Sequence, residues 1–548
     1  MGNALISGVA GLKAHQKMLD VTGNNLANVN SLGYKSARVT FTELLSETLR
    51  GASQPTGSIG GTNPVQIGSG VALATVDRLM TQGGLVNTGQ DLDMAIEGSG
   101  YFVLHNGQRE VYTRVGSFAV DKDYYLVDPA TGYRVQRQGY EGVSEGFQDA
   151  AINNIRIPWD VTLAAKPTEH VSFSGKLSVD TGEATKNELD SGITYTASNA
   201  TVDTSTLLAD LDQATDLADG DKIAITGTDC DGNDVTAELN ITAATTTLGD
   251  LLTAIETTFP GTTASINNGH IKLVDNVAGY SQTNLSLGYT GSGSFELPKY
   301  FELVTPGAER SFEASIDIFD SQGIAHQLTT AFVQTDDSQT WDLVIKSVTG
   351  GVEAIGDRRI SGVSFMTDGS FGGLVGAPPD DQSFTITFSN DPTTPRTIAC
   401  DFGTIGQQDG VTLSGGQATI RTSGQDGYAS GQLSSIAVTS EGVLMGQFDN
   451  GLRQEIAAMK LATFQNPSGL MSIGNGYFAA SGNSGDPVPV RGLSGGAGAV
   501  RGGQLEKSNV EVAAEFVNLI EAQNGFQANA RTITVANEIL RELSNLIR

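Results

Sequence analysis

One short segment of this sequence matches a pattern known from hydrolases. Residues 492–496 read Gly-Leu-Ser-Gly-Gly, which fits Gly-x-Ser-x-Gly, a pattern whose serine needs a strained turn between a strand and a helix. Ser494 instead lies in a run of glycines, which is typical of a flexible linker. We therefore do not interpret Ser494 as a nucleophile.

A second segment contains carboxylates spaced like the ligands of a calcium-binding loop. Asp229, Asp231, Asn233 and Asp234 have part of that spacing. The pattern, however, requires glycine where Asp234 stands and glutamate where Asn240 stands. We expect a polar hairpin turn here.

Histidine and cysteine show no arrangement suited to catalysis or metal binding. The two cysteines, Cys230 and Cys400, are far apart, which argues against a disulfide framework or a zinc site. The histidines show no metal-ligand spacing and no pairing with a cysteine that would suggest a nucleophile; they are His15, His105, His170, His270 and His326. The sequence therefore predicts no catalytic residue, cofactor or metal, and a protein that is not an enzyme.

Charge excludes two classes of partner. The 548 residues include 32 basic and 61 acidic side chains, a formal charge of -29, which opposes binding to nucleic acid or to anionic lipid. No apolar stretch is long enough to span a membrane. Lys13 and Lys17 stand where a cleaved secretion signal needs its apolar run, so we expect either a cytosolic protein or export without a cleaved signal peptide.

Both ends of the chain have the period of amphipathic helices. In residues 1–30, apolar residues recur at intervals of three, four or seven and form a narrow apolar seam on a helix. Residues 509–548 show the same intervals, and this segment contains almost no Gly or Pro. We predict that this seam mediates polymerisation; its members are Leu5, Val9, Leu12, Leu19, Leu26, Val512, Phe516, Leu519, Phe526, Ile533, Leu540 and Ile547. An ordinary amphipathic helix on a globular core is the alternative.

The middle of the chain has the character of β-structure. Segments such as 101–104, 316–319, 327–333 and 341–345 mix β-branched and aromatic residues between turn residues. Residues 181–300 form an acidic block with 17 acidic and 4 basic side chains. In it we predict strands at 222–226, 236–241 and 271–274, and a helix at 248–255 with a capping box of Thr247 and Asp250.

The segment that follows the first helix resembles a known family signature. Residues 24–35 read Asn-Asn-Leu-Ala-Asn-Val-Asn-Ser-Leu-Gly-Tyr-Lys, which resembles the signature of the flagellar rod, hook and hook-associated axial proteins. The residues that carry the match are Asn25, Leu26, Ala27, Asn28, Gly33, Tyr34 and Lys35. Ser31 departs from the threonine more familiar there.

Further stretches resemble the hook proteins in particular. These are residues 425–431, 440–443 and 461–470, together with 505–510 and 527–530 near the C-terminal helix. The resemblance implies a structural subunit of the bacterial flagellar hook, a flexible hollow tube that acts as a universal joint between rod and filament in motility. A distal rod subunit of the same family and an acidic β-rich surface adhesin are the alternatives.

The resemblance also implies location and partners. A hook subunit would lie in the extracellular hook of the basal body, exported through the flagellum's own type III apparatus. Its partners would be other copies of itself, the distal rod protein, the hook cap, the hook-filament junction protein and the export apparatus, with neither nucleic acid nor membrane insertion.

Together these observations predict a mixed fold: α-helical coiled-coil termini, a predominantly β middle of antiparallel sheets and barrels, and an α+β insertion. The expected organisation is a helix of the inner tube at 1–30, a linker at 31–75, an inner β domain at 76–168 and 425–491, an outer β domain at 169–424 carrying the acidic block at about 181–300, a Gly-rich linker at 492–508 and a second tube helix at 509–548.

Overall fold

The computed structural model describes residues 2–57, 59–180, 182–376 and 382–546. The chain divides into two compact units, one formed by residues 1–163 and 431–548 and the other by residues 164–430. The chain passes from one unit to the other after Leu163 and returns before Gly431. We call them the helical unit and the β unit.

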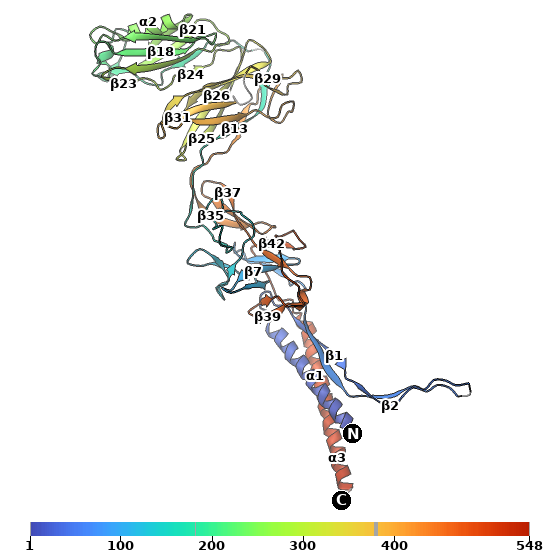
Figure 1. The fold of residues 1–548 in the computed structure, drawn as a ribbon. Helices are drawn as coiled ribbons and strands as arrows, with labels where there is room; N and C mark the ends of the chain where they lie inside the picture. Colours follow the sequence, from blue (N-terminus) through green and yellow to red (C-terminus); the bar gives the residue numbers. More distant parts are fainter. Residues whose placement is uncertain (1, 58, 181, 377–381, 547–548) are drawn as a thin grey trace. The chain divides into compact units, whose positions relative to one another are not determined.

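Two long helices of the helical unit pack against each other, as Figure 1 shows. They are α1 (Gly2–Ala27) and α3 (Val512–Leu546). Gly8 lies beside Ile533 and Gly11 beside Asn529, so the helices are antiparallel. The predicted terminal helices are confirmed, and none of the described helices is long and apolar enough to cross a membrane.

The segment expected as a linker between α1 and the β domain contains four strands. They form two antiparallel pairs, β1 (Ala37–Glu43) with β4 (Val71–Arg78) and β2 (Ser46–Arg50) with β3 (Val65–Gly68). The β2–β3 hairpin extends away from the helix pair in Figure 1.

The remaining strands of the helical unit interleave the two halves of the chain. Two short antiparallel pairs join β5 (Leu85–Asn87) to β43 (Gln504–Glu506) and β6 (Met94–Glu97) to β42 (Ala499–Gly502). A nine-stranded sheet contains β7 (Tyr101–His105), β8 (Glu110–Thr113), β9 (Ala119–Val120), β10 (Leu126–Val127), β11 (Arg134–Val135), β38 (Leu461–Thr463), β39 (Met471–Gly474), β40 (Tyr477–Ala479) and β41 (Val488–Val490). A four-stranded sheet contains β12 (Thr162–Leu163), β35 (Gly431–Val438), β36 (Val443–Phe448) and β37 (Arg453–Ala458).

The β unit has two larger sheets around one apolar core. One contains β13 (His170–Ser178), β28 (Val352–Ile355), β31 (Ser383–Phe388), β32 (Arg396–Asp401), β33 (Val411–Ser414) and β34 (Arg421–Gln425). The other contains β25 (Ser311–Phe319), β26 (Ala325–Gln334), β27 (Thr340–Val348), β29 (Arg359–Phe365) and β30 (Phe371–Leu374). Phe173, Phe332, Trp341 and Phe384 are fully buried between them.

The acidic block has a core of its own within the β unit. Its main strands are β14 (Glu188–Asp190), β18 (Lys222–Thr228), β19 (Asp234–Asn240), β20 (Thr262–Asn267), β21 (His270–Asp275), β22 (Asn284–Thr290) and β24 (Glu302–Thr305); short pairs join β15 (Thr196–Ala197) to β16 (Ala200–Thr201) and β17 (Ala214–Thr215) to β23 (Ser294–Phe295). The helix α2 (Leu248–Thr258) begins at the predicted capping box, in which Thr247 accepts from the Asp250 amide and Asp250 accepts from the Thr247 amide. The α+β character of the block and its predicted helix are confirmed.

Most strand pairs are antiparallel, as predicted, but β13 pairs in parallel with β32 and β33. No sheet formed by the described residues closes into a barrel. The largely antiparallel β middle is therefore confirmed, whereas the expected barrels are not found in this part of the chain.

Candidate functional site: the terminal helices and the polar junction beside them

The signature segment ends α1 and turns the chain into β1. The backbone of Gly33 has φ of +62°, a left-handed conformation that glycine adopts without strain. A side chain there would also meet the backbone nitrogen of Val115 at 3.0 Å. The turn therefore needs glycine at this position for two independent reasons.

Asn25 ties the end of α1 to β1 and to α3. It is buried, with 1% of its surface exposed. Its Oδ1 accepts hydrogen bonds from the Ala37 amide at 2.9 Å and the Tyr34 hydroxyl at 3.2 Å. Its Nδ2 donates to the Ala37 carbonyl at 2.8 Å and to Glu515 Oε1 at 3.0 Å. All the usual bonds of the amide are made, so aspartate or leucine would leave a buried partner unsatisfied.

Lys35 is at the centre of a buried ion cluster. Its Nζ lies 2.6 Å from Glu506 Oε1 and donates to the Thr81 carbonyl at 2.7 Å. Glu506 also accepts from the Gly83 amide at 2.8 Å and from Arg114 Nη1 at 3.4 Å. Burial lowers the pKa of Lys35, and the Glu506 carboxylate opposes that shift. Because Lys35 is enclosed and Glu506 is the carboxylate it pairs with, removing Glu506 would leave a buried positive charge without its partner.

Asn509 completes the connection between the two ends of the chain. Its Oδ1 accepts from the Ser36 amide at 2.7 Å, and its Nδ2 donates to the Leu79 carbonyl at 2.7 Å. We call Asn25, Lys35, Arg114, Glu506 and Asn509 the polar junction. It holds the starts of β1 and α3 in one arrangement, so it fixes how the two helices leave the β-strands.

The contact between α1 and α3 is made by small side chains. A methyl group on Gly11 would lie 2.5 Å from Asn529 Oδ1, and one on Gly525 would lie 2.4 Å from the His15 ring. Buried residues of the pair are Gly8, Gly11, Ala14, Thr22, Asn25, Ala522 and Ala536. The helix axes can therefore approach closely, and this small-residue face is a feature that the apolar period did not indicate.

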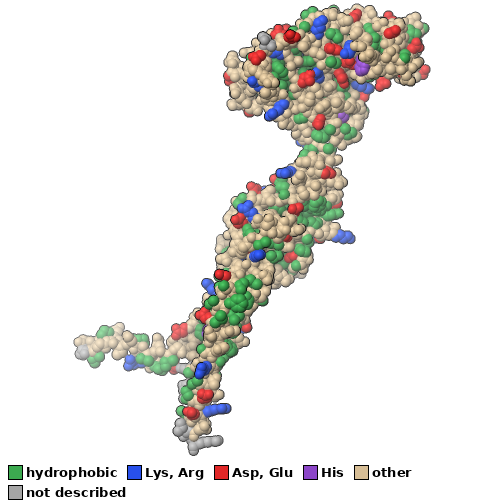
Figure 2. Space-filling model, turned by 180° about the vertical axis from the view of Figure 1, so that it is seen from behind, with side chains coloured by type: hydrophobic (Ala, Val, Ile, Leu, Met, Phe, Trp, Pro, Cys, Tyr) green, Lys and Arg blue, Asp and Glu red, His purple; other side chains and the backbone are tan. Residues whose placement is uncertain are grey.

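The predicted seam residues lie around this contact and remain uncovered to different degrees. Those exposed are Val9, Val512, Phe516 and Leu540; those partly exposed are Leu5, Leu12, Leu19, Leu26, Leu519, Phe526 and Ile533. Ile547 lies outside the described residues. Further apolar side chains, including Ile6, Val517 and Ile520, are also exposed, and Figure 2 shows apolar side chains at the surface of this region.

Two apolar hollows lie on the helix pair. The α1 groove, of about 530 Å³, is lined by Leu5, Ile6, Val9, Lys13, Val71 and Leu73 among others. The α3 groove, also of about 530 Å³, is lined by Ala4, Ala528, Arg531, Thr532, Val535 and Ile539 among others. Each combines an apolar floor with a charged side chain, which suits a protein partner better than a small polar ligand.

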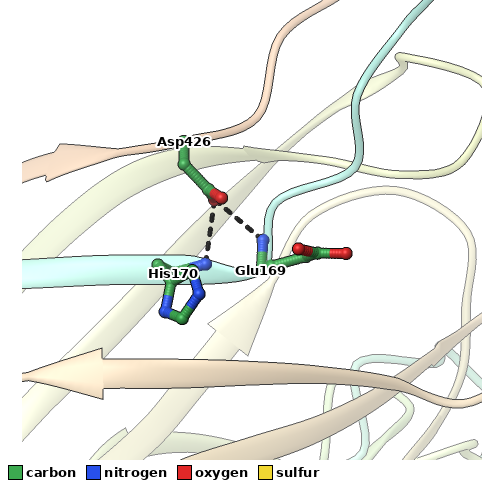
Figure 3. A group of neighbouring side chains, drawn as sticks. All are labelled: Glu169, His170 and Asp426. Atoms are coloured by element: carbon green, nitrogen blue, oxygen red, sulfur yellow. Dashed lines mark hydrogen bonds between the residues drawn. The ribbon is translucent and has the colours of Figure 1, made fainter. Parts of the chain in front are cut away.

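Among the described residues, one group could bring metal ligands together, and Figure 3 shows it in the β unit. It consists of Glu169, His170 and Asp426. One carboxylate oxygen of Asp426 accepts from the backbone amides of Glu169 and His170, each at 2.9 Å. The other lies 2.8 Å from Lys166 Nζ. These bonds occupy the carboxylate, so we assign Asp426 the structural role of holding the start of β13.

The two motifs that resembled catalytic or calcium sites form turns. Ser494 lies between β41 and β42, rather than between a strand and a helix. Asp229 accepts hydrogen bonds from the amides of Asp231 and Asn233 within the hairpin that joins β18 to β19, and these bonds lower its pKa. The polar hairpin turn predicted for this segment is confirmed.

Models of protein families match four parts of the chain. They are "Flagella basal body rod protein" at 5–35, "Flagellar hook protein FlgE/F/G D1 domain" at 95–179, "Flagellar basal body protein FlaE D2 domain" at 292–428 and "Flagellar basal body rod FlgEFG protein C-terminal" at 501–546. The polar junction draws Asn25 and Lys35 from the first match and Arg114 from the second. Glu506 and Asn509 come from the last.

Full-length relatives decide between the members of this group. The flagellar hook protein FlgE of Treponema pallidum is 30% identical over 553 residues, and the alignment covers 100% of both chains. The chain belongs to the flagellar hook protein family. The hook protein FlgE of Borreliella burgdorferi is 29% identical over 552 residues, again with 100% of both chains covered.

These relatives also bear on the alternatives. The rod protein FlgG of Bacillus subtilis is 44% identical, but over 135 residues that make up 25% of this chain. The crystal structure of Helicobacter pylori flagellar hook protein FlgE2 aligns with 76% of this chain and 99% of its own at 16% identity, with a TM-score of 0.40. The full-length relatives and the family models identify the protein as a structural subunit of the flagellar hook, from a non-enzymatic family, as the sequence motifs indicated.

Proposed function

We propose that this hook subunit polymerises through α1 and α3, whose apolar surface is covered by neighbouring copies. The observation that carries the proposal is the exposure of the seam after the two helices have packed together: Val9 remains 42% exposed and Phe516 49% exposed. Apolar patches of this kind mark surfaces that associate. The assembled helices would form the coiled inner layer of a hollow tube.

The arrangement supports a helical polymer rather than a two-fold symmetric dimer. The α1 groove and the α3 groove are different surfaces, so a contact between them joins unlike patches of two copies. Contacts of this type continue indefinitely when the rotation between copies does not close. A tube built this way can serve as the universal joint that transmits torque from rod to filament.

The division of the chain into functional layers is part of the proposal. We propose helices at 1–30 and 509–548 for the inner tube, segments 31–75 and 492–508 as connections, an inner β domain from 76–168 with 425–491, and an outer β domain at 169–424. The polar junction supports this division, because it anchors the connections where they meet the helices. We further propose four partners: the distal rod protein, the hook cap, the hook-filament junction protein and the export apparatus. Export would proceed through the flagellar type III apparatus.

Charge placed in the seam tests the proposal. Val9→Asp and Phe516→Asp alter side chains that the single chain leaves exposed, so the purified chain keeps its fold while a neighbour would bury an unpaired carboxylate. We expect cells that produce either variant as their sole hook subunit to form rods without hooks, as seen by electron microscopy. Val277→Asp, which changes an exposed apolar residue of the acidic block, is the control that should leave hooks intact. Normal hooks from both seam variants would refute the proposed contact.

A further inference from the structure

The charges beside the two grooves have complementary order. On α1, Lys13 and Asp20 are seven residues apart, and on α3, Arg531 and Glu538 are also seven apart. All four side chains belong to exposed residues. A seven-residue step returns to nearly the same face of a helix, so each pair lies along one line. On each helix the basic residue precedes the acidic one. When two such helices lie antiparallel, the basic residue of one helix is therefore opposite the acidic residue of the other.

These charges do not meet within one chain. In the intrachain contact, Gly8 lies at the same height along the helix axes as Ile533, and Gly11 at the same height as Asn529. Since both helices rise by about 1.5 Å per residue, Lys13 lies at the height of about residue 527. Glu538 is therefore about 16 Å away along the axis. Lys13 has no carboxylate partner among the described residues, and Asp20 has only the exposed pair with Lys17 at 3.1 Å.

We infer that the α1 groove of one copy receives the outer face of α3 from a second copy, antiparallel and shifted by about 11 residues, or 16 Å, from the intrachain register. In this register Lys13 pairs with Glu538 of the second copy, and Asp20 pairs with its Arg531. The inference rests on the proposed assembly through α1 and α3, and it specifies which residues meet.

An exposed apolar ridge on α3 begins beside the line of charges. Val535, Ile539 and Leu543 follow one another at four-residue steps and are all exposed, so they form one ridge on α3. Val535 is about 60° from Glu538 around the helix axis, so it lies beside the line of charges and faces the first copy. Ile539 and Leu543 are rotated progressively further from that line and lie at the edge of the contact or outside it.

The two sides of the contact are different surfaces of the chain. One copy therefore offers its α1 groove to one neighbour and its α3 ridge to another. This contact is heterologous, and it builds an open helical tube when the rotation between copies does not close a ring. The partner is thus a further copy of the same chain, and the displacement between copies follows the helix axes.

Cysteine cross-linking in assembled hooks tests the register. In a Cys230→Ser background, Val9→Cys with Glu542→Cys places two thiols level between copies, whereas Gln16→Cys with Glu542→Cys places them one heptad apart, about 10 Å, beyond disulfide reach. We expect oxidised hooks of the first variant to give a ladder of covalent oligomers and those of the second to give monomers. Intact hooks without a ladder from the first variant would overturn the register, while assembly through the helices would stand.

Charge reversal gives a second, independent test. Lys13→Glu and Glu538→Lys should each lower hook number about fivefold by setting like charges against each other, with less effect at high salt. The double variant should restore hook number, and only an intermolecular contact can produce that rescue because the two residues are distant within one chain. Failure of the double variant to recover would overturn the inference even if the cysteine variants failed to assemble.

Discussion

At the scale of single residues, Glu506 is the group on which the polar junction most depends. Glu506→Ala would leave Lys35 buried without its carboxylate, which should cost about 3–5 kcal/mol of the free energy of unfolding of this region. Hydrogen exchange of the Ser36 amide, which is bonded to Asn509 rather than to Glu506, measures that loss. Glu238→Ala is the control, because its partner Lys222 is exposed, and should cost about 1 kcal/mol or less. Equal effects would show that the junction is not a buried cluster in solution.

A second residue-scale prediction concerns Asp320 in the β unit. Burial alone would raise the pKa of Asp320, but hydrogen bonds from the Ile324 amide, the His326 ring and other donors bring it below its usual value. The unfolded chain therefore binds the proton at higher pH than the folded chain. Stability from this group is present above about pH 4 and is lost as the pH falls further.

Urea unfolding of the wild type and of Asp320→Asn at several pH values checks this sign. The difference in free energy of unfolding should be largest at neutral pH and should shrink as the pH drops below about 4. A difference that grows on acidification would contradict the proposed role of the carboxylate.

Sequence reasoning found one side of the polar junction and missed its partners. Asn25, Gly33 and Lys35 were identified from the sequence because the whole segment around them resembles a known family signature. Lys35 and Glu506, however, are 471 positions apart, and a single sequence contains no signal that pairs residues so distant. A buried lysine can be inferred from sequence only after its counter-charge is known.

At the scale of elements, the apolar period predicted the two helices but not how they meet each other. The leucines at seven-residue spacing stay partly exposed, while Gly8, Gly11 and Ala14 form the contact. A pattern search for apolar residues passes over glycine and alanine, so this face gave no signal. The strand segments predicted at 101–104 and 316–319 lie within β7 and β25, because β-branched and aromatic residues between turn residues define strands locally.

The close helix contact leads to a prediction at the scale of the element. Gly11→Leu would force the larger side chain against Asn529, and overpacking of this kind costs about 1–3 kcal/mol. Hydrogen exchange of α1 amides should accelerate about tenfold or more. Gly23→Leu is the matched control on the same helix, because a Cβ at this position would have no atom within 4 Å apart from its own helix and chain neighbours. Unchanged exchange in Gly11→Leu would mean that the helices do not pack through this face.

At the scale of the whole molecule, the chain combines a helical unit that carries the proposed contacts with a β unit that contains a large insertion. The family models leave 180–291 unmatched, whereas the alignments to the two full-length hook proteins cover all of both chains. The segment 492–508, expected as a linker, contains β42 paired with β6 and β43 paired with β5. Glycine content alone could not distinguish a flexible connection from a segment whose glycines permit close backbone pairing.

The acidic block is joined to the β unit at adjacent positions, which makes a clean deletion feasible. The Thr185 amide donates to the Ala308 carbonyl at 2.8 Å, so a short glycine link can replace 186–307. The deletion would expose Val333 and Val344, which pack in the core of the block. Replacing both by threonine should keep the exposed sheet face soluble, and threonine retains a high β-propensity.

We expect the shortened chain with both threonines to fold and to form hooks visible by electron microscopy, since it retains α1, α3 and the polar junction. Circular dichroism and resistance to proteolysis report folding, and the same deletion without the threonines is the control for exposed apolar surface. A folded, soluble chain that forms no hooks would show that the block contributes to assembly, and the contacts between copies would then have to extend beyond the helices.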